Sequence, residues 1–237
     1  MKILAFDSTA KAASVAVCED ERLLALYNVD NGMTHSELLL PMAQNMLSSL
    51  KLDISEIDIF ATAHGPGSFT GVRIGTALIK GLAFGRDIPC VEVSTLEALA
   101  ENLSGTDGLI VACMDARRQQ VYTATFLSDG KNITRLTEDR AMSLIELADE
   151  LREEKRKIYL VGDGYEIAKK SMDREAVDTC VTPPLSIYQS AYSIARLAFK
   201  KYQRGEYTND ASVKPTYLRM PQAERERLER LKVKGGN

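Results

Sequence analysis

The chain has 237 residues, 45% hydrophobic and 27% charged, which is enough for one domain or two fused lobes with their own cores. Its formal net charge is −3, which argues against a protein that grips nucleic acid by itself. Four widely spaced cysteines without a C-x-x-C pair form neither a disulfide framework nor a zinc motif, and no apolar run is long enough to span a membrane. We therefore expect a cytoplasmic protein.

The first part of the chain predicts a strand meander followed by alternating helices and strands. Short apolar runs bounded by polar turns favour strands, and longer segments with apolar residues three and four positions apart favour helices. Thr34 with Glu37, and Ser94 with Glu97, have the spacing of helix capping boxes. The expected elements are strands over 2–7, 14–18 and 22–29, a helix over 34–50, a strand over 58–63, a helix over 70–85, a strand over 89–93 and a helix after Ser94.

The same order then begins again in a shorter form. Residues 109–129 repeat the layout of the first hairpin, and Asp115 stands where Asp7 stands. A helix over 143–151 and a strand over 157–161 follow. This second half is shorter and its expected helices are fewer, and the best account is a weak internal duplication.

A duplicated βββαβα unit resembles the acetate-kinase, sugar-kinase, Hsp70 and actin superfamily, in which two hairpins face each other across a cleft and clamp nucleotide phosphates. We therefore expect an α/β, two-lobed actin/Hsp70/sugar-kinase-like (ASKHA) fold with a reduced second lobe. The first lobe would contain residues 1–104 and a returning helix over 188–204, and the second lobe residues 105–187. Residues 205–237 would form a C-terminal extension.

In an active member of that superfamily, Asp7 and Asp115 would lie near the phosphates and orient water or a metal ion. The loop that follows Asp7 has no glycine, although a backbone that wraps a phosphate needs the close approach that glycine permits. We therefore favour the interpretation that Asp7 caps its own hairpin turn. Asp7, Ser8, Thr9 and Asp115 remain the candidates for a weak nucleotide contact.

Residues 65–75, GPGSFTGVRIG, look like a phosphate cradle or a catalytic loop but match neither pattern. No Gly-Lys-Ser/Thr follows, and Ser68 is not in a G-x-S-x-G elbow. His35 and His64 are the only histidines and lack the His-x-x-x-His spacing of a catalytic zinc site. We expect His64 to bond backbone and His35 to fill a polar helix start, so neither catalytic nor metal-binding residues are predicted.

The two helices on either side of the strand at 58–63 predict a contact surface. The helix over 34–50 has two apolar stripes, so it is either fully buried or meets another protein, and we favour the second. Glycines inside the helix over 70–85 cost roughly 1 kcal/mol each, which close approach of another backbone would offset. The candidate partner-binding residues are His35, Leu38, Leu39, Met42, Met46, Gly71, Gly75, Leu78 and Leu82.

Four segments resemble the bacterial TsaB (YeaZ) family, in the expected order over nearly the whole chain. They are ILAFDST at 3–9, GPGSFTGVRIG at 65–75, DARRQQVY at 115–122 and KPTYLRMPQAE at 214–224. The first half is also similar to the related catalytic subunit TsaD. TsaD-like chains carry an H-x-x-x-H metal pair after the strand that ends here at Val93, where this chain has Thr95 and Leu99.

The resemblance implies a non-catalytic scaffold that pairs with a TsaD-like catalytic subunit and with a TsaE-like ATPase. Their complex transfers a threonylcarbamoyl group to an adenosine beside the tRNA anticodon, and tRNA is held only through the complex. Pairing through the helices at 34–50 and 70–85 is implied, with a weak homodimer when the chain is alone. No cofactor is required, although a weak ATP or ADP contact at a subunit interface is compatible with the family.

Three alternatives stay open on the sequence alone. The chain could be an active ATPase or small-molecule kinase of the same superfamily, a metallopeptidase, or a homodimer with no other partner. If the helix over 34–50 does present a partner-binding face, Met42→Glu should weaken assembly and leave the monomer folded.

Overall fold

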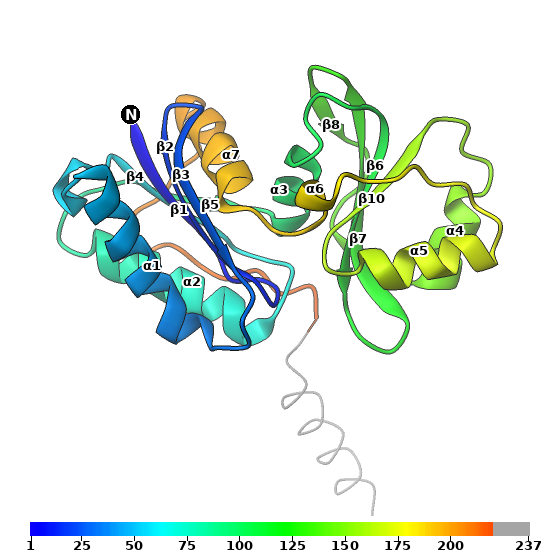
Figure 1. Ribbon diagram of the computed structural model, residues 1–237, viewed down its shortest axis with the longest axis horizontal. Coiled ribbons are helices and arrows are strands. Elements are labelled where there is room, and N and C mark those ends of the chain that lie inside the picture. The colour runs from blue at the N-terminus through cyan, green and yellow to red at the C-terminus, as the bar shows by residue number, and fades with distance from the viewer. Residues whose placement is uncertain (220–237) are drawn as a thin grey trace, which may run out of the picture.

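The computed structural model describes residues 1–219 and has two lobes, each centred on a five-stranded sheet (Figure 1). Residues 220–237, which make up the larger part of the expected C-terminal extension, lie outside the described residues. Within residues 1–219, no helix combines the length and the apolar content that crossing a membrane requires.

The first sheet has the strand order β3-β2-β1-β4-β5, with β1 antiparallel to β2 and parallel to β4. Helices α1 and α2 cover one face, and α7 covers the other, so the last helix returns to the first lobe as expected (Figure 1). The elements are β1 (Lys2–Asp7), β2 (Ala13–Glu19), β3 (Arg22–Val29), α1 (His35–Leu50), the 3-10 helix η1 (Ile54–Glu56), β4 (Ile59–Ala63), α2 (Phe69–Ala83), β5 (Cys90–Val93), α3 (Thr95–Glu101) and α7 (Ala191–Gln203).

The second sheet repeats this plan, with the order β10-β6-β7-β8 and β9 paired to β7. Here β6, β7 and β10 take the places of β1, β2 and β4, which confirms the duplicated two-lobed fold. Helices α4 and α5 cover one face. The elements are β6 (Asp107–Asp115), β7 (Gln120–Asp129), β8 (Ile133–Arg135), β9 (Arg140–Ser143), α4 (Leu144–Leu151), β10 (Ile158–Val161), α5 (Tyr165–Arg174) and α6 (Pro184–Ile187).

The sequence analysis missed helix α5 of the second lobe. Its residues are mostly polar, and only Ala168, Ser171 and Met172 are buried. Since these three positions repeat at helical spacing, tertiary burial of one narrow stripe is enough to fix the helix.

Helix α3 lies between the two lobes (Figure 1). Leu96 and Leu99 pack in one cluster with Ile110 and Ala112 of the second sheet, whereas the other end of the helix bonds to α7, where Lys200 donates to Glu101. The sequence assigned α3 to the first lobe because it follows β5, but its leucines belong to the core of the second.

The apolar side chains of α1 turn toward the protein's own core. Leu39 and Met46 are buried, and Met42 is only 7% exposed. The expectation that Leu39, Met42 and Met46 form part of a free second face is therefore wrong, because α1 packs against both the sheet and α2 and so buries both stripes. Leu40, which is 41% exposed, is the apolar residue of α1 that does point outward.

The glycines at the start of α2 make room for the chain's own β1–β2 loop. A Cβ atom at Gly71 would lie 1.8 Å from the carbonyl oxygen of Ser8, and one at Gly75 would lie 2.7 Å from the hydroxyl oxygens of Ser8 and Thr62. Close approach of another segment explains these glycines, as predicted, but that segment belongs to the same chain and not to a partner. The assignment of Gly71 and Gly75 to a partner interface is thus corrected.

Replacing Gly71 with alanine should destabilise the protein by at least about 2 kcal/mol, because the new methyl group overlaps a backbone oxygen that cannot move without shifting β1. The matched control is Gly81→Ala in the same helix, where a Cβ meets nothing within 4 Å. That variant should gain roughly 0.5–1 kcal/mol from helix propensity. Urea denaturation measures both, and similar stabilities for the two variants would contradict the packing described.

Candidate functional site in the cleft between the lobes

The four segments that carry the family resemblance converge on one cleft between the lobes. This cleft has a volume of about 970 Å³. Its walls are the β1–β2 loop, the 66–69 loop before α2, the β6–β7 hairpin and the strap, a name we give to residues 211–219. Segments more than 200 residues apart in the sequence thus form one site.

The β1–β2 loop is held against α2 by its own side chains. The Asp7 carboxylate accepts hydrogen bonds from the backbone N–H of Thr9 at 2.8 Å and from its hydroxyl at 2.6 Å, and Ser8 donates to the carbonyl oxygen of Gly71 at 2.8 Å. The interpretation that Asp7 caps its own turn is confirmed. All three residues are buried, so Ser8 and Thr9 offer almost no side-chain surface to a nucleotide.

The loop that looks like a phosphate cradle is filled by the same chain. A Cβ at Gly67 would lie 2.6 Å from the carbonyl oxygen of Thr9, and the N–H of Ser68 donates to that oxygen at 2.7 Å. Ser68 also caps α2 by accepting from the N–H of Gly71. The N–H groups of Ser68 and Gly71, which could have bound a phosphate, are therefore bonded to oxygen atoms of the same chain.

Asp115 and Asp163 line the floor of the cleft, and the carboxylate of Asp7 is fully buried at the end of β1. Burial raises the pKa of Asp7 to about 6, and its Oδ2 atom has no hydrogen-bond partner among residues 1–219. Burial, together with the nearby carboxylates of Asp115 and Asp7, raises the pKa of Asp163 to about 6. The backbone N–H of Asp115 donates to Asp163 at 3.2 Å.

Asp163 was not among the predicted site residues, although the Gly162-Asp163-Gly164 turn was visible at the end of β10. The turn signal marked a loop, but only the parallel pairing of β10 with β6 brings Asp163 beside Asp115. Asp115 itself is half-buried and lies 3.5 Å from the guanidinium group of Arg117.

Both histidines serve structural contacts. The Nδ1 atom of His64 lies 2.7 Å from the hydroxyl of Thr216, and burial lowers the pKa of its imidazole to about 4. The Nε2 atom of His35 lies 2.7 Å from the carbonyl oxygen of Ala10, so His35 joins α1 to the β1–β2 loop. The two positions that would carry a metal pair in TsaD-like chains, Thr95 and Leu99, are buried.

The strap ties α2 to the second lobe. The ring of Tyr217 lies 4.8 Å from that of Phe69, and its hydroxyl accepts from Nε of Arg73 at 2.8 Å. Two residues further on, Arg219 donates to the side-chain oxygen of Gln120 at 2.6 Å. The strap therefore contacts the start of α2 at one end and the β6–β7 hairpin at the other.

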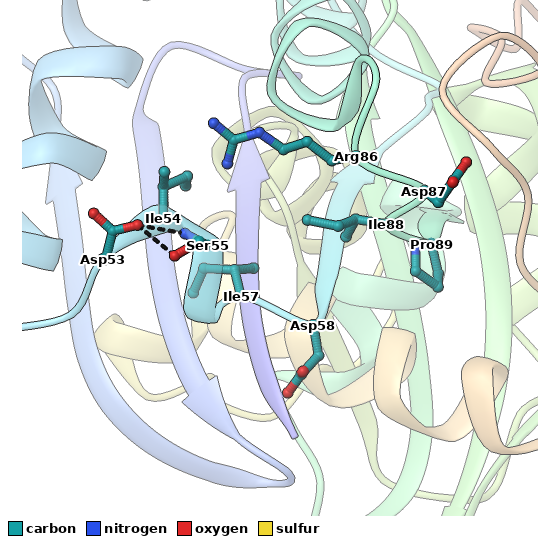
Figure 2. Close-up of a pocket in the computed structure, with 9 residues that line it drawn as sticks. All are labelled: Asp53, Ile54, Ser55, Ile57, Asp58, Arg86, Asp87, Ile88 and Pro89. Carbon is teal, nitrogen blue, oxygen red and sulfur yellow. Dashed lines mark hydrogen bonds between the residues drawn. The ribbon is translucent and has the colours of Figure 1, made fainter.

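A second hollow, of about 530 Å³, lies at the opposite end of the first sheet, where β4 and β5 begin (Figure 2). Figure 2 shows Asp53 turned back onto Ser55, whose N–H and hydroxyl it holds as the cap of η1. None of the family segments reaches this hollow. Among residues 1–219, no group of three or more histidine, cysteine or acidic side chains is placed to hold a metal ion.

Comparisons with known proteins agree on one family. A family model described as TsaD, tRNA N6-adenosine threonylcarbamoyltransferase, matches residues 31–226. The chain is 32% identical over 173 residues to the tRNA threonylcarbamoyladenosine biosynthesis protein TsaB of Bacillus subtilis, which covers 73% of this chain and 76% of that protein. It is 30% identical over 222 residues to TsaB of Escherichia coli, with 92% and 95% covered.

The solved structures give the same result. YeaZ from Pseudomonas aeruginosa has a TM-score of 0.75 and 25% identity to this chain, and the match covers 92% of this chain and 99% of that one. A second structure from the same organism, described as similar to peptidase YEAZ, has a TM-score of 0.76 and 26% identity.

Asp7→Asn should make the protein more stable than the wild type at pH 7.5, and the difference should shrink by roughly 1 kcal/mol at pH 5. The native state binds the Asp7 proton more tightly than the unfolded state, because the folded pKa is raised to about 6. Lowering the pH through 6 therefore stabilises the wild type but not the variant. Urea denaturation of both proteins at the two pH values measures this. His64 is present in both proteins, so the pH dependence that it contributes cancels in the comparison. A difference in unfolding free energy that is the same at both pH values would contradict the raised pKa of the buried Asp7 carboxylate.

Proposed function

The chain belongs to the TsaB (YeaZ) family, and from this we propose that it is a non-catalytic subunit of the complex that forms threonylcarbamoyladenosine in tRNA. The curated relatives in this family are tRNA threonylcarbamoyladenosine biosynthesis proteins. In the proposal, the chain binds and activates a TsaD-like catalytic subunit, and it meets the TsaE-like ATPase and tRNA only through the assembly.

A non-catalytic role is supported by the way the chain uses its polar groups. His35 and His64, the only histidines, bond other parts of the same chain. The hydroxyl of Ser8 donates to the carbonyl oxygen of Gly71 and that of Thr9 to Asp7, so the active ATPase or kinase alternative lacks an open phosphate cradle. Thr95 and Leu99 leave no chelating imidazole where TsaD-like chains carry one.

The observation that carries the proposal is the outer surface of α1 and α2, which has few charged residues although 27% of the chain is charged. No charged residue occurs from Leu38 to Leu50. In α2, Arg73 is bonded to Tyr217, and Lys80 donates to the carbonyl oxygens of residues 211 and 213 in the strap. Depletion of charged residues is typical of the centres of protein interfaces.

The proposed docking face consists of residues that reach this surface. Leu40 and Phe84 are 41% and 78% exposed, and Leu38, Leu78 and Leu82 are partly buried. Leu38, Leu78 and Leu82 stay in the proposal, whereas Leu39, Met42 and Met46 support the face from behind. The same face can pair weakly with a second copy of the chain, because such an isologous contact needs only one self-complementary surface. No cofactor is required for this role.

Leu40→Glu combined with Ala77→Glu should weaken binding to the TsaD-like subunit at least tenfold, because both positions are exposed on the outer face and the new charges must be desolvated on docking. Met42→Glu is not a suitable probe, since Met42 is buried and a charge there would unfold α1. Calorimetric titration of the purified TsaD-like subunit into each variant measures the affinity.

The matched control is Ile145→Glu, which places the same charge on an exposed apolar residue of α4 in the second lobe. It should bind like the wild type, and circular dichroism should show unchanged folding for all variants. Full affinity in the double variant would refute the docking face, and no binding by the wild-type chain would refute the proposed function itself.

A further inference from the structure

The cleft between the lobes contains a buried amide that has nothing to bond. The side chain of Gln189 lines the cleft and is 3% exposed, yet neither Nε2 nor Oε1 has a hydrogen-bond partner among residues 1–219. Buried donors and acceptors are almost always paired, because leaving them unpaired forfeits their hydration. An amide that keeps both groups free beside a cavity is suited to a ligand that offers an acceptor and a donor.

Gln189 lies next to the acidic floor of the cleft. The carbonyl oxygen of Ile187, two residues before Gln189, accepts from the N–H of Gly162, the residue before Asp163, at 2.6 Å. On the other side, the N–H of Ala191 donates to Ser14 of β2 at 2.8 Å. The segment that carries Gln189 is thus tied to both lobes, and Gln189 and Asp163 line the same cleft.

The floor favours a positive group over a phosphate. Asp163 is close to the carboxylates of Asp115 and Asp7, and the buried Oδ2 of Asp7 has no hydrogen-bond partner within residues 1–219. Like charges in a desolvated site repel one another and are relieved by a cation. Since no metal-binding cluster occurs within residues 1–219, an ammonium group, which accepts looser geometry than a metal ion, fits the floor better.

The wall beside this floor is positively charged. Arg117 pairs with Asp115 at 3.5 Å and leaves its side chain 81% exposed. It begins a run of three residues with left-handed backbone, in which Arg117, Arg118 and Gln119 have φ of 67°, 54° and 58°. Such strain in consecutive residues with side chains is uncommon and is typical of functional sites. The carboxylate of Asp163 and the guanidinium group of Arg117 together suit a ligand that carries one positive and one negative charge.

We propose that the cleft binds a small zwitterion of the α-amino-acid class, with its ammonium group against Asp163, its carboxylate toward Arg117 and the amide of Gln189 bonded to both. The ligand occupies the floor of the cavity, which is large enough to admit it with any side chain. This site is independent of the α1 and α2 docking face, so its test does not depend on the proposed assembly.

Titration calorimetry of the full-length chain with each of the twenty L-amino acids tests the proposal. At least one should bind with a Kd in the micromolar to low millimolar range. Its N-acetyl derivative, which lacks the ammonium group, should bind at least tenfold more weakly. Failure of all twenty to bind would overturn the proposal. Tighter binding of Mg-ATP, displaced by no amino acid, would assign the cleft to a nucleotide and overturn it as well.

Two variants separate a ligand site from a structural role. Gln189→Leu should reduce the affinity at least tenfold while the thermal unfolding midpoint stays the same or rises, because an unpaired buried amide has been removed. Arg117→Gln, at an exposed position, should weaken binding several-fold without affecting folding. The control Gln203→Leu, at the exposed end of α7, should bind like the wild type. Wild-type affinity in Gln189→Leu, or a lower midpoint with affinity unchanged, would overturn the proposal.

Discussion

The contact between the backbone of α2 and the β1–β2 loop governs the rest of the first lobe. Ser8 donates to the carbonyl oxygen of Gly71, and its own carbonyl oxygen occupies the space where any other residue at position 71 would place a side chain. This contact seats α2 beside α1 on one face of the sheet (Figure 1). The same β1–β2 loop accepts from the N–H of Ser68 and lines the cleft, so this contact shapes both the outer face and the cleft.

Two surfaces with different chemistry result from this arrangement. The outer face of α1 and α2 has few charged residues, and two of them, Arg73 and Lys80, are bonded to the strap. The cleft, in contrast, collects buried carboxylates and an unpaired amide. Removing water costs little at the outer face, which suits a protein partner. Removing water from the polar groups of the cleft is costly, which suits a small polar ligand that replaces the lost hydrogen bonds.

The strap connects these two surfaces physically. Thr216 is bonded to His64, Tyr217 is stacked on Phe69 at the start of α2, and Arg219 is bonded to Gln120 in the second lobe. A shift of the second lobe relative to the first would therefore strain contacts made by α2. The imidazole of His64 stays neutral through the physiological range because burial lowers its pKa to about 4, so this connection does not titrate near neutral pH.

The sequence by itself determined the strand and helix order of the first lobe, the repeated hairpin of the second, the capping of the Asp7 turn and the family, because these depend on local periodicity, turn chemistry and motif order. It could not determine which apolar stripe of α1 faces outward, why Gly71 is a glycine, or that Asp163 belongs to the cleft. Those features depend on which distant segments touch, and hydrophobic pattern is the same whether a side chain is covered by its own chain or by another. Only the tertiary structure shows that Met42 is covered from within and that Gln189 is left unpaired at the cleft.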